Sequence, residues 1–161
     1  MTGDCRFVNL VKSLLHNIGV MAVGFGIAFL GAALDSLFGF TSFKSLIAAA
    51  AAWLLLAAGF LLRVWATYLF YERRMKVISL VPQNRLITTG PYRFSRNPLY
   101  LGGNVLIFAG AALFLGSVDG LLLTGFATLA TDFMIRREER QLEREFGEEC
   151  VRYKNQVRRW I

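Results

Sequence analysis

Residue types that can do chemistry are concentrated in two short polar stretches of this sequence. The first includes Arg96, Asn97 and Tyr100, and the second contains the adjacent pair Glu138 and Glu139. Neighbouring carboxylates, together with an arginine and a phenol, are suited to binding a cationic or hydroxyl-bearing ligand. Taken by itself, the glutamate pair is also what a solvent-exposed helix face contains, and that simpler interpretation stays open at this point.

Histidine and cysteine are too few for several familiar kinds of site. The chain has one histidine, His16, and two cysteines, Cys5 and Cys150, near its opposite ends. These isolated residues do not have the spacing of a zinc site, and they provide no Ser-His-Asp or Cys-His arrangement. We therefore predict no metal centre and no histidine-activated nucleophile.

Long apolar runs separate the polar stretches. The 161 residues are 55% hydrophobic and only 18% charged, a balance unlike that of a soluble domain. A helix that crosses a bilayer needs roughly 20 apolar residues. Because four runs reach or approach that length, we predict four transmembrane helices, at about 14–34, 45–70, 99–116 and 119–137.

Two of the predicted helices contain a charged residue near one end. Arg63 lies in the second helix and Asp132 in the fourth. Charged side chains inside a membrane usually pair with one another or line a wet cavity. We therefore expect Arg63 and Asp132 to face the same interior and to form a pair.

The distribution of basic residues predicts the orientation of the chain. Most of the 18 lysines and arginines lie in the N-terminal tail, in 71–97 and in 136–161, whereas the other two loops hold only Lys44. By the positive-inside rule, both termini and the loop at 71–98 are then cytoplasmic. The net charge of +7 therefore indicates topology and contact with anionic membrane lipids, and we predict no nucleic-acid partner.

The last two predicted helices form an antiparallel hairpin, because only a short turn around Val118 joins them. Gly102 lies 16 residues before Val118 and Glu138 lies 20 residues after it, which is roughly 24 Å and 30 Å along the two helices. The two polar stretches should therefore reach nearly the same depth and face one pocket at the membrane surface.

Apolar residues recur at helical spacing beyond the glutamate pair. The members of this stripe are Leu142, Phe146, Cys150, Tyr153 and Val157. The spacing predicts an amphipathic helix over 138–157, with a kink at Gly147. Such a helix either closes the pocket from the cytoplasm or only anchors the chain at the interface.

The two polar stretches together resemble a family signature. The resemblance is carried by Arg96-Asn97-Pro98-Leu99-Tyr100-Leu101-Gly102 and, after the hydrophobic hairpin, by Glu138-Glu139. These residues are similar to the RHPxYxG motif and the paired glutamates of the isoprenylcysteine carboxyl methyltransferase and phospholipid methyltransferase family. The likeness includes the upstream Gly90-Pro91-Tyr92-Arg93 and the tail Val157-Arg158-Arg159-Trp160, and it covers about half of the chain. Asn97 stands where the family has histidine, Arg158 where it has proline, and Cys150 where it has tyrosine.

The resemblance implies methyl transfer that depends on S-adenosyl-L-methionine, at the cytoplasmic face of a membrane. Carried over by position, the catalytic residues would be Arg96, Asn97, Tyr100 and Glu138. The residues that would bind the cofactor are Tyr100, Gly102, Gly103, Glu138 and Glu139. The implied acceptor is lipid-like or prenylated and presents either a carboxylate or a phospholipid amine.

The resulting prediction is an all-α integral membrane protein with a single domain over 1–161, four transmembrane helices and a C-terminal cytoplasmic amphipathic helix. Its loops are short, so the acceptor is expected to enter laterally from the bilayer. Two other classes stay open, a nicotinamide-dependent membrane reductase of the sterol-reductase type and a non-catalytic four-helix membrane protein. The oligomeric state does not follow from the sequence.

Overall fold

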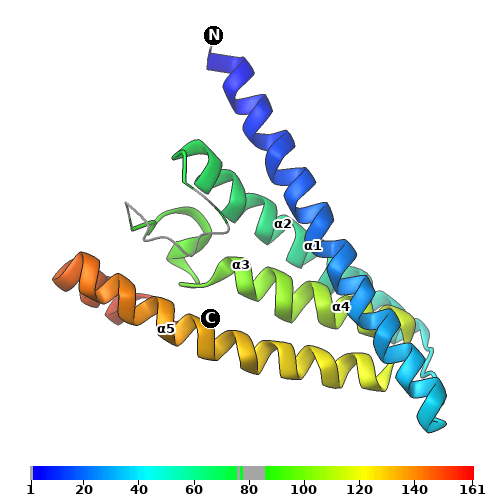
Figure 1. Cartoon of the computed structure of the whole chain (residues 1–161). Helices are drawn as coiled ribbons and strands as arrows, with labels where there is room; N and C mark the ends of the chain where they lie inside the picture. Colours follow the sequence, from blue (N-terminus) through cyan, green and yellow to red (C-terminus); the bar gives the residue numbers. More distant parts are fainter. Residues whose placement is uncertain (1, 76, 78–85) are drawn as a thin grey trace.

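The computed structural model describes residues 2–75, 77 and 86–161, with side chains from residue 6 onward. Every regular element in this part of the chain is helical, as predicted (Figure 1). The elements are α1 (Thr2–Phe38), α2 (Leu46–Glu72), the 3-10 helix η1 (Gly90–Arg93), α3 (Pro98–Tyr100), the π-helix η2 (Leu101–Ile107), α4 (Phe108–Leu115) and α5 (Val118–Gln156). The turn-forming residues 82–85 of the predicted loop lie outside the described residues.

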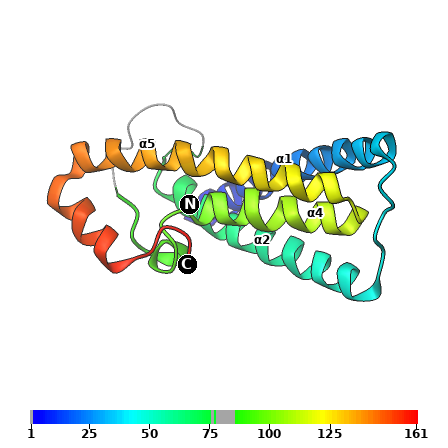
Figure 2. The ribbon, with the colours of Figure 1, turned by 90° about the horizontal axis from the view of Figure 1, so that it is seen from below.

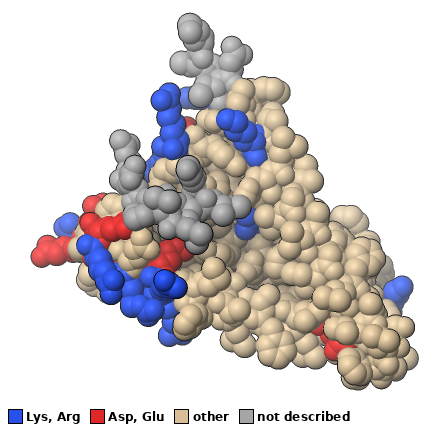
Figure 3. Space-filling view, viewed as in Figure 1, with Lys and Arg blue, Asp and Glu red and all other residues tan. Residues whose placement is uncertain are grey.

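Four helical segments are long and apolar enough to span a membrane, in agreement with the hydrophobic runs. They are α1, α2, the nearly continuous rod from Pro98 to Leu115, and α5. Large apolar side chains point outward from these helices, including Phe29, Leu54 and Phe126, each at least 60% exposed. Figure 3 shows most charged side chains at one end of the molecule, beside a broad uncharged surface. An apolar outer surface of this kind is suited to lipid contact.

The helix α5 is longer than the predicted fourth span. It continues from Val118 to Gln156 and changes direction at Gly147, where φ is 51° and ψ is −126°. Glycine adopts this backbone conformation readily because it has no Cβ. The predicted kink is therefore confirmed, and the helix expected over 138–157 is the continuation of α5 and not a separate element. Figure 2 shows the last turns of α5 directed away from the axis of its first part.

The predicted hairpin joins α4 to α5 through a tight turn. α4 ends at Leu115 and is capped by Gly116, whose φ of 66° is left-handed. Ser117 caps α5 by accepting a hydrogen bond from the Gly120 N–H at 2.8 Å. The N–H of Phe43 donates to the Gly116 carbonyl at 3.1 Å, which attaches the loop between α1 and α2 to the same turn. Because the hairpin is antiparallel, the start of α3 and the polar part of α5 lie at the same end of the bundle.

Close packing of α2 against the third span depends on a glycine. A Cβ added at Gly59 would lie 2.6 Å from the carbonyl oxygen of Gly102 and 2.9 Å from a side-chain carbon of Ile107. Ile107 is itself fully buried. Small residues at a helix crossing let two backbones approach closely inside a membrane. This crossing fixes the position of η2, and with it the residues just before η2, relative to α2.

The expected pair between Arg63 and Asp132 is wrong. Arg63 Nε donates to Asn17 Oδ1 at 2.7 Å, and its Nη1 donates to the Leu99 carbonyl at 2.5 Å. Asp132 instead accepts from Arg136 at 2.7 Å and from Arg159 at 3.3 Å. The physical reason is helix rotation, because Arg63 points from α2 toward α1 and α3, whereas Asp132 points from α5 toward the C-terminal tail.

Replacing Gly59 by alanine tests the close helix crossing. Overpacking a well-packed site costs about 1–3 kcal/mol, which exceeds the roughly 1 kcal/mol that alanine gains over glycine within a helix. Gly59→Ala should therefore lower the thermal unfolding temperature of the protein in detergent. Gly26→Ala is the matched control, because nothing lies within 4 Å of a Cβ added there, and it should be neutral or stabilising. Equal effects of the two substitutions would contradict this crossing.

Candidate functional site

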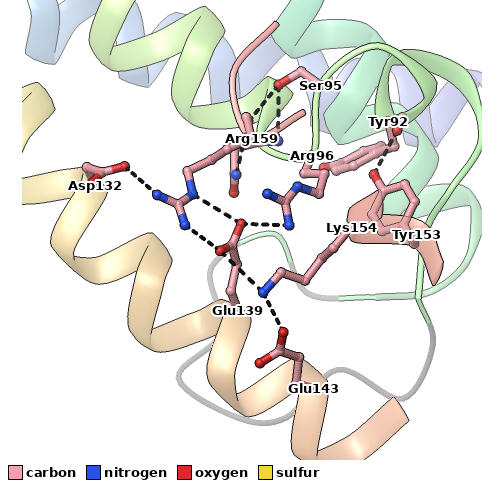
Figure 4. A network of polar contacts seen from close by, with 10 residues as sticks. Tyr92, Ser95, Arg96, Asp132, Glu139, Glu143, Tyr153, Lys154 and Arg159 are labelled. Atoms are coloured by element: carbon pink, nitrogen blue, oxygen red, sulfur yellow. Dashed lines mark hydrogen bonds and ion pairs between the residues drawn. The ribbon is translucent and has the colours of Figure 1, made fainter. Parts of the chain in front are cut away.

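A network of charged side chains lies at the end of the bundle where the loop before α3, the polar part of α5 and the C-terminal tail meet (Figure 4). The carboxylate of Glu139 is at its centre and is only 8% exposed. Arg159 donates to both of its oxygens, at 2.8 and 3.2 Å. Arg96 Nη1 lies 3.2 Å from it and Lys154 Nζ 3.9 Å. One buried carboxylate thus holds cations from three places in the sequence.

Two more acidic residues complete the network. Asp132 receives a hydrogen bond from Arg159, and Glu143 pairs with Lys154. The hydrogen bond to the Glu139 carboxylate raises the pKa of Arg159 above its usual range, which means that the contact stabilises the charged guanidinium. Alternating signs of charge lower the cost of burying each group, because every desolvated charge has a close counter-charge.

The C-terminal tail reaches this network because the chain turns at Gly147. Beyond α5, the carbonyl of Arg158 accepts a hydrogen bond from the Arg96 N–H at 3.0 Å. The carbonyl of Arg159 accepts from the Ser95 hydroxyl and from the Asn97 side-chain amide, both at 3.2 Å. The tail is therefore attached to the loop before α3 through its own backbone carbonyls. One N–H of the Asn97 side-chain amide takes part in this attachment.

A second contact joins the last turn of α5 to η1. The Tyr153 hydroxyl donates to the carbonyl oxygen of Tyr92 at 2.7 Å. Tyr92 is buried, and this burial raises the pKa of its phenol well above the ordinary value. The Tyr92 side chain is consequently neutral, and it packs in the apolar cluster with Phe70 and Ile87.

A cavity lies between these elements. The empty space between them, counted together with its open mouth, is about 740 Å³. Its apolar walls come mainly from α2, the segment before η1, and α5, with Phe70, Ile87 and Ile135 among the contributors. Tyr100 and Glu138 contribute polar groups, and the Tyr100 hydroxyl donates to Glu138 Oε2 at 3.4 Å.

The structure brings together most of the residues that the sequence predicted for the site. Those lining the cavity are Arg96, Asn97, Tyr100, Glu138 and Glu139. The contact between Tyr100 and Glu138 agrees with the expectation that the two polar stretches reach the same depth. Gly102 and Gly103 are buried and lie against the Arg63 side chain, and they are not among the residues that line this cavity.

Two neighbouring glutamates have different surroundings in this site. Glu139 is buried and engaged by three cations. Glu138 is exposed at the cavity and, within the part of the chain that the structure describes, makes no ion pair. Glu138 is therefore the carboxylate with a charge left for a ligand.

Sequence reasoning missed the cations that hold Glu139. Arg159 was part of a recognised tail motif, but its spacing from Glu139 gives no sign of contact. Lys154 stands beside the apolar stripe of α5, one position after Tyr153, and looks like an ordinary solvated charge. Only the reversal at Gly147 brings both residues back to the centre of α5.

A bundle with four helices suited to a membrane, and a mainly apolar cavity with a few polar groups at one end, defines a class of membrane protein. Comparison with known sequences gives the family. The family model described as phospholipid methyltransferase matches residues 47–149, well over half of the chain. The protein belongs to this family. An uncharacterized protein of Haemophilus influenzae is 43% identical over 58 residues, which make up 35% of this chain and 92% of that protein. No solved structure matches the chain.

Replacing Arg159 tests whether the Glu139 network holds the tail. Hydrogen bonds to charged groups contribute about 1.5–3 kcal/mol where they are shielded from water, and Arg159 is a quarter exposed, so Arg159→Gln should cost about 1–2 kcal/mol. Undocking should also expose Tyr153, which is 8% exposed, to cleavage by chymotrypsin. Unfolding temperature and cleavage rate in detergent measure the two effects.

The control for this experiment is Arg158→Gln. It removes the same charge from the neighbouring position, whose side chain is exposed and whose backbone carbonyl makes the tail contact. This variant should unfold and be cleaved like the unmodified protein. If both substitutions accelerate cleavage equally, net charge and not the Arg159–Glu139 contact holds the tail.

Proposed function

We propose that this protein transfers a methyl group from S-adenosyl-L-methionine to a lipid-like acceptor at the membrane. The observation that carries the proposal is the pairing of Tyr100 with Glu138 at an apolar cavity, in a chain that belongs to the phospholipid methyltransferase family. The family supports methyl transfer in general. It supports neither of the other two classes left open by the sequence, the nicotinamide-dependent reductase and the non-catalytic bundle.

The residues at the cavity fit this cofactor. Its amino-acid end is cationic at the amine, and it carries a second positive charge at sulfur, so its site requires a carboxylate and aromatic or apolar walls. Glu138 has a charge that no described cation neutralises, and the Tyr100 ring lies beside it. When bound, S-adenosyl-L-methionine supplies a methyl group already activated by its sulfonium.

The chain's own residues then have separate tasks. Glu138 holds the positive amine of the cofactor, and Tyr100 orients the Glu138 carboxylate through its hydroxyl. Arg96, Asn97 and Glu139 keep the tail and the loop together, so that the cavity wall excludes water and holds the reactants in position. In this proposal Glu139 acts on the cofactor indirectly, by holding the cavity wall together. Contact between the cofactor and Gly102 or Gly103 stays a prediction, because neither glycine lines the cavity.

The acceptor decides whether a base is needed. A carboxylate is ionised at pH 7 and attacks directly, whereas a protonated phospholipid amine must first lose a proton. His16 lies beside Arg63 and not among the residues that line the cavity. The Tyr100 phenol already carries its proton, and Glu138 is engaged by the cofactor amine in this proposal, so water would accept the proton of the acceptor. We propose that the acceptor enters from the bilayer and that both termini and the segment 71–98 are cytoplasmic, on the basis of the basic residues in these segments.

Replacing Glu138 tests the cofactor site. Glu138→Gln removes the negative charge but leaves the shape of the side chain and the surrounding network intact. Loss of one charged hydrogen bond should weaken binding of S-adenosyl-L-methionine by about 10- to 100-fold, measured by titration calorimetry in detergent. The unfolding temperature should not change, because Glu138 is exposed and, among the described residues, its side chain is hydrogen-bonded only to Tyr100.

Two further variants make the result specific. Glu149→Gln, at an exposed position of the same helix, should bind the cofactor normally. Glu139→Gln should lower the unfolding temperature as well as affinity, because it leaves three cations without their shared carboxylate. Unchanged affinity in Glu138→Gln would return this residue to the interpretation of a solvated helix face.

The acceptor class can be tested in native membranes that contain the protein. S-adenosyl-L-methionine labelled in its methyl group should transfer label to the fraction extracted by organic solvent. Membranes that contain Glu138→Gln serve as the control and should transfer little label at the same cofactor concentration. Label that appears only in water-soluble products would contradict a lipid-like acceptor.

A further inference from the structure

Arg63 is a buried cation that the proposed mechanism has not yet used. It lies in α2, is 7% exposed and belongs to a segment apolar enough to span a membrane. Its guanidinium donates to Asn17 Oδ1 at 2.7 Å and to the Leu99 carbonyl at 2.5 Å, and it lies 3.3 Å from His16 Nε2. Among the described residues it contacts no carboxylate. An unpaired charge in such a position is costly, which points to a function beyond packing.

The Arg63 side chain reaches Leu99 by passing over two glycines. A Cβ added at Gly102 would lie 2.7 Å from Arg63 Cγ, and one added at Gly103 would lie 2.6 Å from Arg63 Nη1. Any larger residue at either position would therefore meet the alkyl chain or the guanidinium. The two glycines that follow Tyr100 form the path along which Arg63 extends from α2 to α3.

The group that Arg63 holds is directly connected to the candidate site. The carbonyl of Leu99 belongs to the same planar peptide unit as the N–H of Tyr100. A hydrogen bond to that carbonyl fixes the rotation of this peptide, and with it the direction in which the Tyr100 side chain leaves the backbone. The Tyr100 hydroxyl in turn lies 3.4 Å from Glu138 Oε2 at the cavity.

Joining α1 to α2 does not require Arg63. Asn17 Nδ2 donates to Thr67 Oγ1 at 2.8 Å, and the Ser13 hydroxyl donates to the Val64 carbonyl at 2.9 Å. These contacts connect the two helices without the guanidinium. What Arg63 adds is a bond to α3, made by a forked side chain whose other branches are held by Asn17 and His16.

We propose that Arg63 is a positioning residue for methyl transfer, which fixes the Leu99–Tyr100 peptide and thereby aims the Tyr100 phenol at the cavity. Gly102 and Gly103 serve this arrangement by giving the arginine its path. The inference rests on the proposed function, because Tyr100 is assigned there to orient the Glu138 carboxylate that holds the cofactor. It adds a residue of α2 to the determinants of the site and gives Gly102 and Gly103 a physical task.

The first experiment compares Arg63→Met with Thr67→Val. Both substitutions remove polar contacts from the interface of α1 and α2, but only the first removes the bond to Leu99. Arg63→Met should lower the rate of methyl transfer to membrane lipid about 10- to 100-fold, because a cofactor that is not held in line with its acceptor reacts more slowly. Its affinity for S-adenosyl-L-methionine, measured by calorimetry, should fall by a smaller factor than the rate, since Glu138 keeps its charge and loses only its orientation by Tyr100. Thr67→Val should transfer methyl groups at the normal rate.

A purely structural role predicts a different pattern. The two variants would then lose activity in proportion to their loss of unfolding temperature, and affinity and rate would fall together. Arg63→Lys provides a further distinction, because it keeps the charge but loses the fork. It should resemble Arg63→Met in rate, and normal activity in Arg63→Lys would overturn the proposal.

The glycine path gives an independent test. Gly103→Ala alters no charged or hydroxyl group, but the alanine side chain would displace the Arg63 guanidinium. The rate of methyl transfer by this variant should therefore fall as in Arg63→Met. In a variant that carries both Gly103→Ala and Arg63→Met, the two losses of rate should not multiply, because Arg63→Met alone already removes the bond to the Leu99 carbonyl. Multiplying losses would show that Gly103 and Arg63 act separately.

A spectroscopic measurement separates this inference from the proposed function. With 3-fluorotyrosine at position 100, the fluorine resonance of the detergent-solubilised protein should shift in Arg63→Met and Gly103→Ala, and should not shift in Thr67→Val. A protein that transfers no methyl group but shows this pattern would refute the proposed function and leave the positioning of Tyr100 intact. A resonance that is the same in all variants would overturn the inference, whatever the activity.

Discussion

The buried carboxylate of Glu139 is the interaction on which the candidate site depends. Arg96 comes from the loop before α3, Lys154 from the last turns of α5 and Arg159 from the tail, and all three contact this one group. Without a shared counter-charge, these cations would repel one another at short distance. Glu139 thus holds three separate chain segments together as one wall of the cavity, and its first role is structural.

The adjacent position has the opposite character for a simple geometric reason. Consecutive residues of an α-helix point about 100° apart around its axis, because there are 3.6 residues per turn. With Glu139 directed into the network, Glu138 is turned toward the cavity and Tyr100. A pair of glutamates therefore gives the protein one structural carboxylate and one that no cation of the described residues engages, without any insertion in the helix.

Close backbone approach is a second constraint, and it acts on the other side of Tyr100. The crossing at Gly59 brings α2 against η2, and the glycines at 102 and 103 leave space for the Arg63 side chain. Inside a membrane, apolar side chains gain little from leaving lipid for another apolar surface, so contacts of this kind carry much of the helix association. The same glycines consequently serve packing and the site together.

The sequence by itself determined the features that depend on order along the chain. Hydrophobic length predicted the four spans, glycine at position 147 predicted the kink, and residue counts on either side of Val118 placed Tyr100 level with Glu138. Only the tertiary structure decided which charges pair. The partner of Arg63 depends on how α2 is rotated about its axis, and the contact of Arg159 with Glu139 depends on the reversal of the chain after Gly147. Neither the rotation of a helix nor the reversal of the chain changes the length or the spacing of the hydrophobic runs, so neither can be read from the sequence. The sequence therefore shows that a charge in an apolar segment needs a partner, and the folded structure determines which partner it has.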